Sequence, residues 1–137
     1  MRTKKELTDK LIKARYPQDI VEQTVGYIEE LGYINDKDYA ERYAKDAFSF
    51  KKAGELRIKR ELVLKGIPRE IAENVFEDSE LNFATNLRKL IENKAERMDL
   101  FDYKDKNRLF AFLARRGYRS SDISAAISEY TQNLETE

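Results

Sequence analysis

The feature that most constrains the fold is a short segment that recurs three times at equal spacing. The copies begin at Leu11, Leu62 and Leu113, so consecutive copies lie 51 residues apart. In the second and third copies a glycine, Gly66 or Gly117, follows four positions later. Glycine readily takes the left-handed conformation that ends many helices, and self-similarity at a long fixed period is typical of repeat proteins. The sequence therefore predicts a helix, a tight turn and a second helix in each copy.

Prolines and apolar periodicity mark the helices that follow these turns. Pro17 and Pro68 suit the first helical position, and Ser120 or Ser121 can cap the last helix. A pattern of mainly apolar residues with the 3.6-residue period of a helix then follows in all three copies. They are Ile20, Val21, Thr24, Val25 and Ile28 in the first, Ile71, Ala72 and Val75 in the second, and Ile123, Ile127, Tyr130 and Leu134 in the third.

A further helix is expected ahead of the second and third turns. One runs from Asp36, its N-cap, to about Phe50, and the other from Ser79 to about Ala95. Each carries a stripe on one side that we assign to the core. The stripes are Tyr39, Tyr43, Ala47 and Phe50 in one helix and Phe83, Leu87, Leu90 and Lys94 in the other.

These elements predict a helical fold without strands. No segment alternates apolar and polar residues between turn signals as a strand would. We therefore expect an all-α fold of tandem three-helix repeats that form an elongated, curved array. The first repeat lacks its leading helix, and the three repeats are expected at residues 1–34, 35–78 and 79–137.

Composition excludes several kinds of chemistry. The 137 residues contain no cysteine and no histidine, which removes disulfides, thiolate nucleophiles and the commonest general base and metal ligand. The five glycines are scattered, so no phosphate-binding loop is formed. No signal peptide is recognisable, and the longest apolar run, residues 109–114, is too short to span a bilayer. We expect a cytoplasmic, monomeric protein that is not an enzyme and needs no cofactor, metal or membrane.

The formal net charge is zero, but the charges are unevenly distributed along the repeats. The segments that hold the middle helices are basic, with net charges of +4, +4 and +5 over residues 2–15, 51–67 and 104–119. The segments that hold the third helices are acidic, with net charges of −5, −4 and −4 over residues 17–38, 68–80 and 121–137. Stacked repeats would align these helices into a basic and an acidic ribbon. A basic ribbon favours a linear, charged partner, although solvation and pairing between neighbouring repeats would also account for the charges.

The cations of the two complete basic helices are the residues that we expect to bind the partner. They are Lys51, Lys52, Arg57, Lys59, Arg60 and Lys65 in the second repeat, and Lys104, Lys106, Arg108, Arg115 and Arg116 in the third. In the second repeat, Ile58 and Leu62 mark the buried side of the helix, whereas Leu56 and Val63 lie on roughly the opposite side. Those two apolar residues indicate either a contact surface or packing against a neighbouring repeat.

Two stretches combine these features in a recognisable order. The first is Leu31-Gly32-Tyr33-Ile34-Asn35-Asp36, followed by Tyr39, Ala40 and Tyr43 and then by Gly54-x-x-Arg57-Ile58-x-x-Glu61-Leu62-x-x-Lys65-Gly66-Ile67. The second is Lys106-x-Arg108-Leu109-x-x-Phe112-Leu113-x-Arg115-Arg116-Gly117-Tyr118. Over about residues 4 to 130, the sequence resembles the RecX family of bacterial recombination regulators. Leu56 departs from the family pattern, which commonly has a basic residue there, and the family usually has a complete first repeat.

The resemblance implies a partner and an activity. It implies an array that binds along the helical groove of the RecA filament on single-stranded DNA and restrains RecA's ATP hydrolysis, strand exchange and filament growth. The cellular setting would then be DNA recombination, DNA repair and the SOS response. Direct contact of the basic helices with DNA is a second expectation.

Other functions compete with this interpretation. A metal-dependent nuclease would need convergent carboxylates, but Asp36 and Asp38 are too close in sequence to face one another on a helix. A helix-turn-helix reader would need cations or amides at the start of its recognition helix, where this sequence has mainly acidic or small residues such as Glu70 and Asp122. A DNA-binding module that contacts the phosphate backbone without RecA, and a purely structural scaffold, remain as alternatives.

Overall fold

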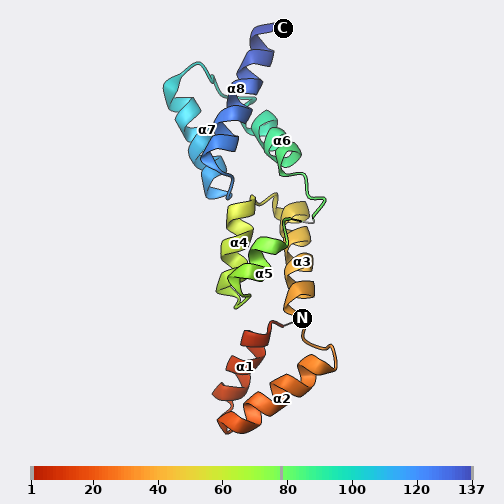
Figure 1. The fold of residues 1–137 in the computed structure, drawn as a ribbon. Helices are drawn as coiled ribbons and strands as arrows, with labels where there is room; N and C mark the ends of the chain where they lie inside the picture. The colour runs from red at the N-terminus through yellow and green to blue at the C-terminus, as the bar shows by residue number, and fades with distance from the viewer. Residues whose placement is uncertain (1, 78, 137) are drawn as a thin grey trace. The chain divides into compact units, whose positions relative to one another are not determined.

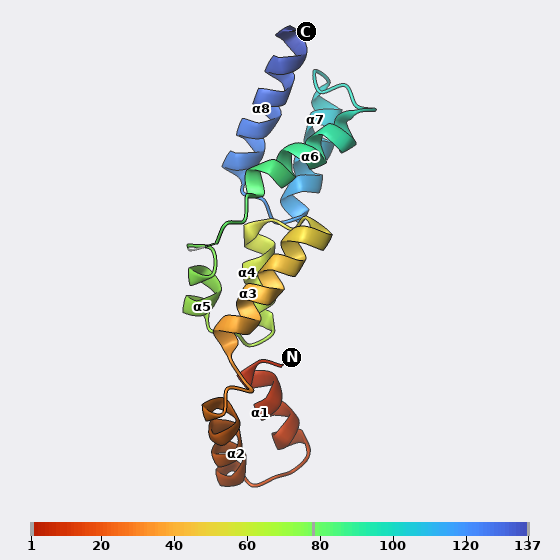
Figure 2. The ribbon, with the colours of Figure 1, turned by 90° about the vertical axis from the view of Figure 1, so that its right-hand side faces the viewer.

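The computed structural model describes residues 2–77 and 79–136, and all regular elements within them are helical. The expected all-α fold of tandem three-helix repeats is confirmed. Residues 1, 78 and 137, which the expected repeat boundaries include, lie outside the described residues. In chain order the elements are α1 (Lys4–Lys13), α2 (Gln18–Glu30), α3 (Asp36–Asp46), the π-helix η1 (Ala47–Lys51), α4 (Glu55–Leu64), α5 (Arg69–Asn74), α6 (Phe83–Ala95), α7 (Tyr103–Arg115) and α8 (Ser120–Thr136) (Figures 1 and 2).

The three repeated turns share one backbone geometry. Left-handed φ angles occur at the equivalent positions Arg15 (+68°), Gly66 (+94°) and Gly117 (+101°), so the expected turns at the two glycines are confirmed. In each copy the N–H of the next residue donates to the carbonyl oxygen five positions back. These bonds join Tyr16 to Leu11 (3.4 Å), Ile67 to Leu62 (3.0 Å) and Tyr118 to Leu113 (3.3 Å). The 51-residue spacing in the sequence is therefore also a repeat of structure.

The helix expected from Asp36 to about Phe50 differs from the prediction at both ends. Its N-cap is Asn35 rather than Asp36, because the Asn35 Oδ1 accepts a hydrogen bond from the N–H of Asp38 (3.1 Å). The Asp36 carboxylate instead accepts the N–H of Lys4 (3.0 Å). At the other end the α-helical turns stop at Asp46 and continue as η1. A π-turn adds a residue per turn, so the helical phase of the sequence no longer predicts which side chains are buried.

Two other predicted helix starts are wrong. The helix expected from Ser79 begins only at Phe83, where the Asn82 Oδ1 accepts the N–H of Thr85 at 3.1 Å and caps the first turn of α6. In the third repeat α8 already includes Ser120, so neither Ser120 nor Ser121 stands at the cap. Short polar side chains are generally favoured at the N-cap of a helix. This preference does not determine which of several neighbouring residues becomes the N-cap.

The two prolines sit one position earlier than expected. Pro17 and Pro68 each precede the first residue of α2 and α5 as the N-cap. Their φ angles of −56° and −55° are close to helical values, and their ψ angles are extended. The prolines therefore still direct the chain into each helix, because their fixed φ suits a helix entrance.

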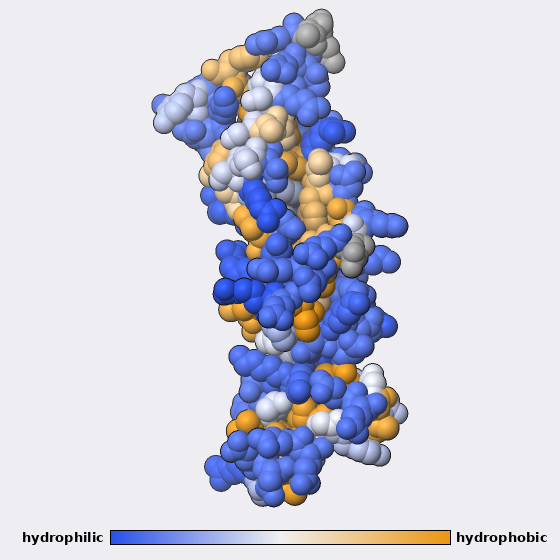
Figure 3. Space-filling view, viewed as in Figure 1, coloured by the Kyte–Doolittle hydropathy of each residue, from blue (hydrophilic) through white to orange (hydrophobic). Residues whose placement is uncertain are grey.

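The described residues form two compact units. The first contains the described residues of 1–46 and 59–79, and the second those of 47–58 and 80–137. In the first unit α1 lies beside α2, and α3 contacts α5. Val21, Val25 and Ile34 form a buried cluster there, with Leu7, Leu11 and Ile28 packed against it. Figure 3 shows hydrophobic atoms at the surface of the α1–α2 part of the chain. The exposed large side chains there include Ile12, Tyr16, Ile20, Tyr27 and Leu31.

The second unit is organised around α6, α7 and α8, which contact one another pairwise (Figures 1 and 2). Leu109 and Leu113 on α7, and Ile123 and Ile127 on α8, are almost completely buried. These pairs are four residues apart, which brings each pair onto one side of its helix. They join Leu87, Leu90 and Ile91 of α6 in a single core cluster. None of the described helices has the length and apolar character needed to cross a bilayer.

The start of the basic helix segment in one repeat packs on the turn that ends the basic helix of the following repeat. This contact occurs twice. In the first unit the Thr3 hydroxyl donates to the carbonyl oxygen of Lys65 (2.8 Å). In the second unit the Gly54 N–H donates to the carbonyl oxygen of Arg116 (2.7 Å). Both members of the second pair lie 51 positions after those of the first. The equivalent backbone carbonyl therefore accepts a hydrogen bond in both copies. The donor is a side-chain hydroxyl in the first copy and a backbone N–H in the second.

Candidate partner-binding surface

All 11 cations expected to bind the partner are exposed or half-buried. Lys59, Arg60 and Lys65 belong to the first unit, and the other eight belong to the second. The apolar residues expected on the outer side of α4 are also exposed, with 44% of Leu56 and 39% of Val63 accessible to solvent. All of these cations are therefore accessible at the surface, and they differ from one another in the residues that surround them.

Four of the predicted cations line one open concavity in the second unit. Its volume is about 480 Å³. We call it the Phe–Arg pocket, and its lining residues are Phe50, Lys51, Arg57, Phe112, Arg115 and Arg116. The end of η1, the first turn of α4 and the last turns of α7 contribute these side chains. Residues more than 50 positions apart in the sequence thus form one cationic surface with two aromatic rings.

Arg116 is held in this pocket by two interactions. Its guanidinium carbon lies 5.1 Å from the centre of the Phe112 ring, and its Nη1 donates to the carbonyl oxygen of Lys51 (2.6 Å). The ammonium group of Lys94 lies 4.8 Å from the centre of the same ring. Cations are attracted to the face of an aromatic ring, so Phe112 gathers positive charge beside the pocket.

The backbone that carries Phe50 and Lys51 is fixed by Tyr118. The Tyr118 hydroxyl donates to the carbonyl oxygen of Lys52 (2.7 Å), and Lys52 itself has a left-handed φ of +50°. Burial raises the pKa of Tyr118 to about 12, against the opposing effect of the positive charge on Arg116. The hydroxyl therefore keeps its proton at neutral pH and remains a donor.

Close backbone packing positions Arg57. The Leu56 N–H donates to the carbonyl oxygen of Gly117 (3.0 Å), and a Cβ atom at position 117 would stand 2.6 Å from the backbone nitrogen of Arg57. Only a residue without a side chain fits there. The turn that ends α7 is thereby brought against the start of α4, which places Arg57 beside Arg115 and Arg116 in the pocket.

The structure does not bring the remaining α7 cations into the pocket. Lys104 and Arg108 lie on roughly the same side of α7 as Arg115, because their separations from it are close to whole numbers of helical turns. Lys106 is two residues from Lys104 and points to roughly the opposite side. Arg108 also lies 3.8 Å from the carboxylate of Asp105. The eight predicted cations of the second unit therefore divide into four that line the pocket and four that do not, which are Lys52, Lys104, Lys106 and Arg108.

The cations of the first unit partly serve its own packing. The ammonium group of Lys59 lies 5.5 Å from the centre of the Phe76 ring, and that of Lys65 lies 5.5 Å from the centre of the Tyr43 ring. The Tyr43 hydroxyl in turn donates to the carboxylate of Glu61. Arg60 is exposed. Among these three predicted residues, Arg60 is thus the one whose loss should disturb the fold least.

Sequence reasoning missed the aromatic component of the pocket. Phe50 was assigned to the buried stripe of its helix, but 84% of its surface is exposed. The reason is the π-helix η1, which shifts the side chains that follow Asp46 out of the α-helical phase. Phe112 was noted only as part of the motif that resembles RecX and was not predicted to bind a partner. The signal that could have identified Phe50 was its position next to two lysines, Lys51 and Lys52.

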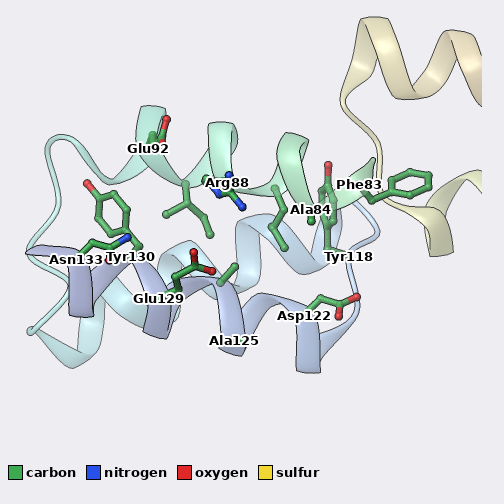
Figure 4. A pocket seen from close by; sticks show the side chains of 13 residues that line it. Phe83, Ala84, Arg88, Glu92, Tyr118, Asp122, Ala125, Glu129, Tyr130 and Asn133 are labelled. Atoms are coloured by element: carbon green, nitrogen blue, oxygen red, sulfur yellow. The ribbon is translucent and has the colours of Figure 1, made fainter. Parts of the chain in front are cut away.

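A second concavity, of about 320 Å³, lies between α6 and α8 (Figure 4). Leu87, Ile91 and Ala126 contribute apolar lining. Arg88 and Glu129 contribute charges of opposite sign. This groove therefore lacks the single sign of charge that distinguishes the Phe–Arg pocket.

Tandem three-helix repeats and a cationic, aromatic surface pocket define a helical-repeat protein with a basic, aromatic pocket on its surface. Two domain models of one family match the sequence, "RecX, second three-helix domain" over residues 35–75 and "RecX, third three-helix domain" over residues 84–127. The chain belongs to the RecX family. The two matches together cover more than half of it.

Similar proteins carry the same family name. The regulatory protein RecX of Clostridium perfringens is 29% identical over 136 residues, which are 96% of this chain and 63% of that protein. The regulatory protein RecX of Yersinia enterocolitica is 25% identical over 113 residues, which are 82% of this chain and 67% of that protein. This chain thus spans slightly less than two thirds of the length of the clostridial relative. RecX is a family of regulatory proteins.

Solved structures support the fold. The crystal structure of RecX from Lactobacillus salivarius superposes with a TM-score of 0.85 at 29% identity, over 94% of this chain and 85% of that chain. A second crystal structure, of a regulatory protein RecX, has a TM-score of 0.78 at 21% identity and covers 90% of this chain and 62% of that chain. The second likeness concerns the fold alone.

Proposed function

We propose that this protein binds the RecA filament on single-stranded DNA and restrains RecA's ATP hydrolysis and the extension of the filament. It would act by binding rather than by catalysis. The identity of the partner rests on membership of the RecX family. The observation that carries the proposal in this chain is the Phe–Arg pocket, which gathers Lys51, Arg57, Arg115 and Arg116 on one open surface.

The charge of this pocket supports an acidic partner. Lys51 and Arg115 are exposed, and within residues 2–77 and 79–136 neither forms an ion pair. Exposed ion pairs are worth little individually, but a group of like charges attracts an opposite surface and accelerates its association. A filament of nucleoprotein supplies carboxylates and phosphates along its length.

Binding through several repeats would make the contact strong. The expected cations of the first unit, such as Arg60, would add contacts to those of the pocket. Linked weak contacts give high overall affinity when their spacing matches that of the target. A repeated surface is therefore well suited to a partner that is itself periodic.

The test is the single-strand-dependent ATP hydrolysis of RecA, measured with increasing concentrations of this protein. We expect the rate to fall as the protein saturates the filament. An unchanged rate at a large molar excess would contradict the proposal. Arg115→Glu should weaken the effect strongly, because it reverses an exposed charge in the pocket. Arg88→Glu, a reversal on α6 outside the pocket, is the matched control and should retain the effect.

The alternative is a module that binds the DNA phosphate backbone without RecA. The aromatic lining of the Phe–Arg pocket favours some contact with nucleic acid. If about four phosphates are neutralised, affinity for duplex DNA should fall about a hundredfold between roughly 50 and 200 mM salt. Tight, salt-sensitive binding to duplex DNA, combined with no effect on RecA, would favour this alternative.

A further inference from the structure

We infer that the Phe–Arg pocket holds one nucleotide of a single strand, with its phosphate on the pocket's cations and its unpaired base stacked on Phe50. The inference rests on the proposed function, because it names the part of a nucleoprotein filament that this pocket would contact. It goes beyond phosphate-backbone binding, since it assigns a role to an aromatic ring and to the base.

The cations provide the phosphate half of the site. Arg57, Arg115 and Arg116 bring three guanidinium groups to the lining, and Lys51 adds an ammonium group. Guanidinium groups are planar and donate pairs of hydrogen bonds that match two oxygens of one phosphate. A volume of about 480 Å³ is also within the usual range of sites for small ligands, which is roughly 300–1,000 Å³.

Phe50 provides the base half of the site. Its side chain is 84% exposed, so the ring is accessible to a base, and covering it would remove apolar surface from water. The other ring of the pocket, Phe112, already has Lys94 and Arg116 over it, so a base would stack on Phe50. Bases stack on aromatic side chains largely irrespective of sequence. A carboxylate of a protein partner would use the cations but would have no need of this exposed ring.

The backbone segments that carry the two halves are tied together. The carbonyl oxygens of Lys51 and Lys52, which follow Phe50 in the chain, accept hydrogen bonds from Arg116 and Tyr118. The residues that carry the ring are therefore anchored to the same turn that carries the guanidinium groups. A site ordered before binding loses less entropy when the ligand arrives.

This geometry predicts a preference for single strands. In a duplex the bases are paired and stacked on one another, so Phe50 could reach one only at the cost of unstacking it. In a single strand the base is accessible. We therefore expect an oligothymidylate to bind more tightly than a duplex of equal length, and more tightly than an equally charged strand without bases.

The experiment is fluorescence anisotropy of a labelled oligothymidylate of about 15 nucleotides, titrated with the full chain in the absence of RecA. Phe50→Ala should lower the affinity about tenfold, whereas Phe50→Trp should retain it. Phe101→Ala is the matched control, because Phe101 is 64% exposed in the same unit but does not line the pocket. Circular dichroism melting of each variant separates loss of binding from loss of folding.

Titrations with an abasic strand and with the thymidine strand then separate the contribution of the phosphates from that of the base. The abasic strand should bind wild type and Phe50→Ala equally, because neither complex has a base to stack. Arg115→Ala should lower affinity for both strands and reduce the dependence on salt. Equal losses from Phe50→Ala and Phe101→Ala, or equal affinity for abasic and thymidine strands, would overturn the inference. So would restraint of RecA's ATP hydrolysis without any binding of free strand, a result that leaves the proposed function intact and assigns the pocket to a protein surface.

Discussion

Gly117 packs directly against Arg57, so closely that a Cβ atom at position 117 would stand 2.6 Å from the Arg57 backbone nitrogen. The equivalent glycine of the preceding copy, Gly66, lies equally tightly against the side chain of Lys5. Each glycine therefore meets two demands, since it ends a helix with a positive φ and leaves room for the start of the preceding repeat's basic helix segment. The 51-residue spacing could be recognised in the sequence because few residue types fit at the position of these two glycines.

Gly117→Ala should destabilise the protein by about 2–4 kcal/mol. A left-handed conformation costs an alanine roughly 1–2 kcal/mol, and the added methyl group would also collide with the backbone at Arg57. Gly26→Ala is the matched control, because Gly26 lies within α2 and a Cβ there would meet nothing within 4 Å. That control should be neutral or stabilising by up to about 1 kcal/mol. Urea unfolding followed by circular dichroism measures both changes, and an equal effect of the two would contradict the assigned packing.

Leu62→Ala should cost about 2–5 kcal/mol, because Leu62 is completely buried and its truncation leaves a cavity. Leu64→Ala, on the same helix, removes a side chain that is 76% exposed and should change stability by no more than about 0.5 kcal/mol. Thermal unfolding of the two variants provides the comparison. A silent Leu62→Ala would show that the buried side of α4 has been wrongly assigned.

The repeat, the helical class and the surface exposure of the cations could be predicted because each depends on local sequence. Leucine spacing and glycine turns report the helix ends directly, although Arg15 adopts the same turn conformation without glycine. The position of Phe50 could not be predicted, because it depends on the π-turn η1, which leaves no periodic signal. Asp36 was assigned to a cap that Asn35 occupies, because two suitable side chains stood next to each other.

The candidate site was predictable only in part. The basic helices were evident from charge counts, but the Phe–Arg pocket depends on a contact between residues near 51–57 and residues near 112–117. Such a long-range contact is fixed by packing at Gly54 and Gly117 rather than by local composition. Charge counts also could not show that Lys59 and Lys65 lie over aromatic rings of their own unit.

Tyr118 should make stability sensitive to alkaline pH. Burial raises its pKa from 10.0 to about 12 in the folded protein, so the unfolded chain loses the phenolic proton first as pH rises. The stabilising contribution is therefore complete below pH 10 and is lost progressively as pH rises towards 12. Urea unfolding at pH values between about 8 and 11 should show this decline.

Tyr118→Phe is the control for that pH dependence. At neutral pH it should lower stability by about 1 kcal/mol through loss of the hydrogen bond to Lys52. Above pH 10 the variant should decline less steeply than the wild type, so the difference between them should narrow. Parallel pH profiles for the two proteins would show that another group is responsible.

Thr3→Ala should destabilise the first unit by about 2 kcal/mol, since Thr3 joins two parts of it. The Thr3 hydroxyl accepts the N–H of Glu6 (3.1 Å) as the N-cap of α1 and donates to the carbonyl oxygen of Lys65 (2.8 Å). Loss of a cap costs about 1 kcal/mol, and loss of a hydrogen bond at a completely buried residue adds about as much. Thr3→Ser keeps the hydroxyl and should retain most of the stability. Thr8→Ala removes an exposed hydroxyl that bonds only within its own helix, and amide hydrogen exchange should show faster opening of α1 in Thr3→Ala than in either control.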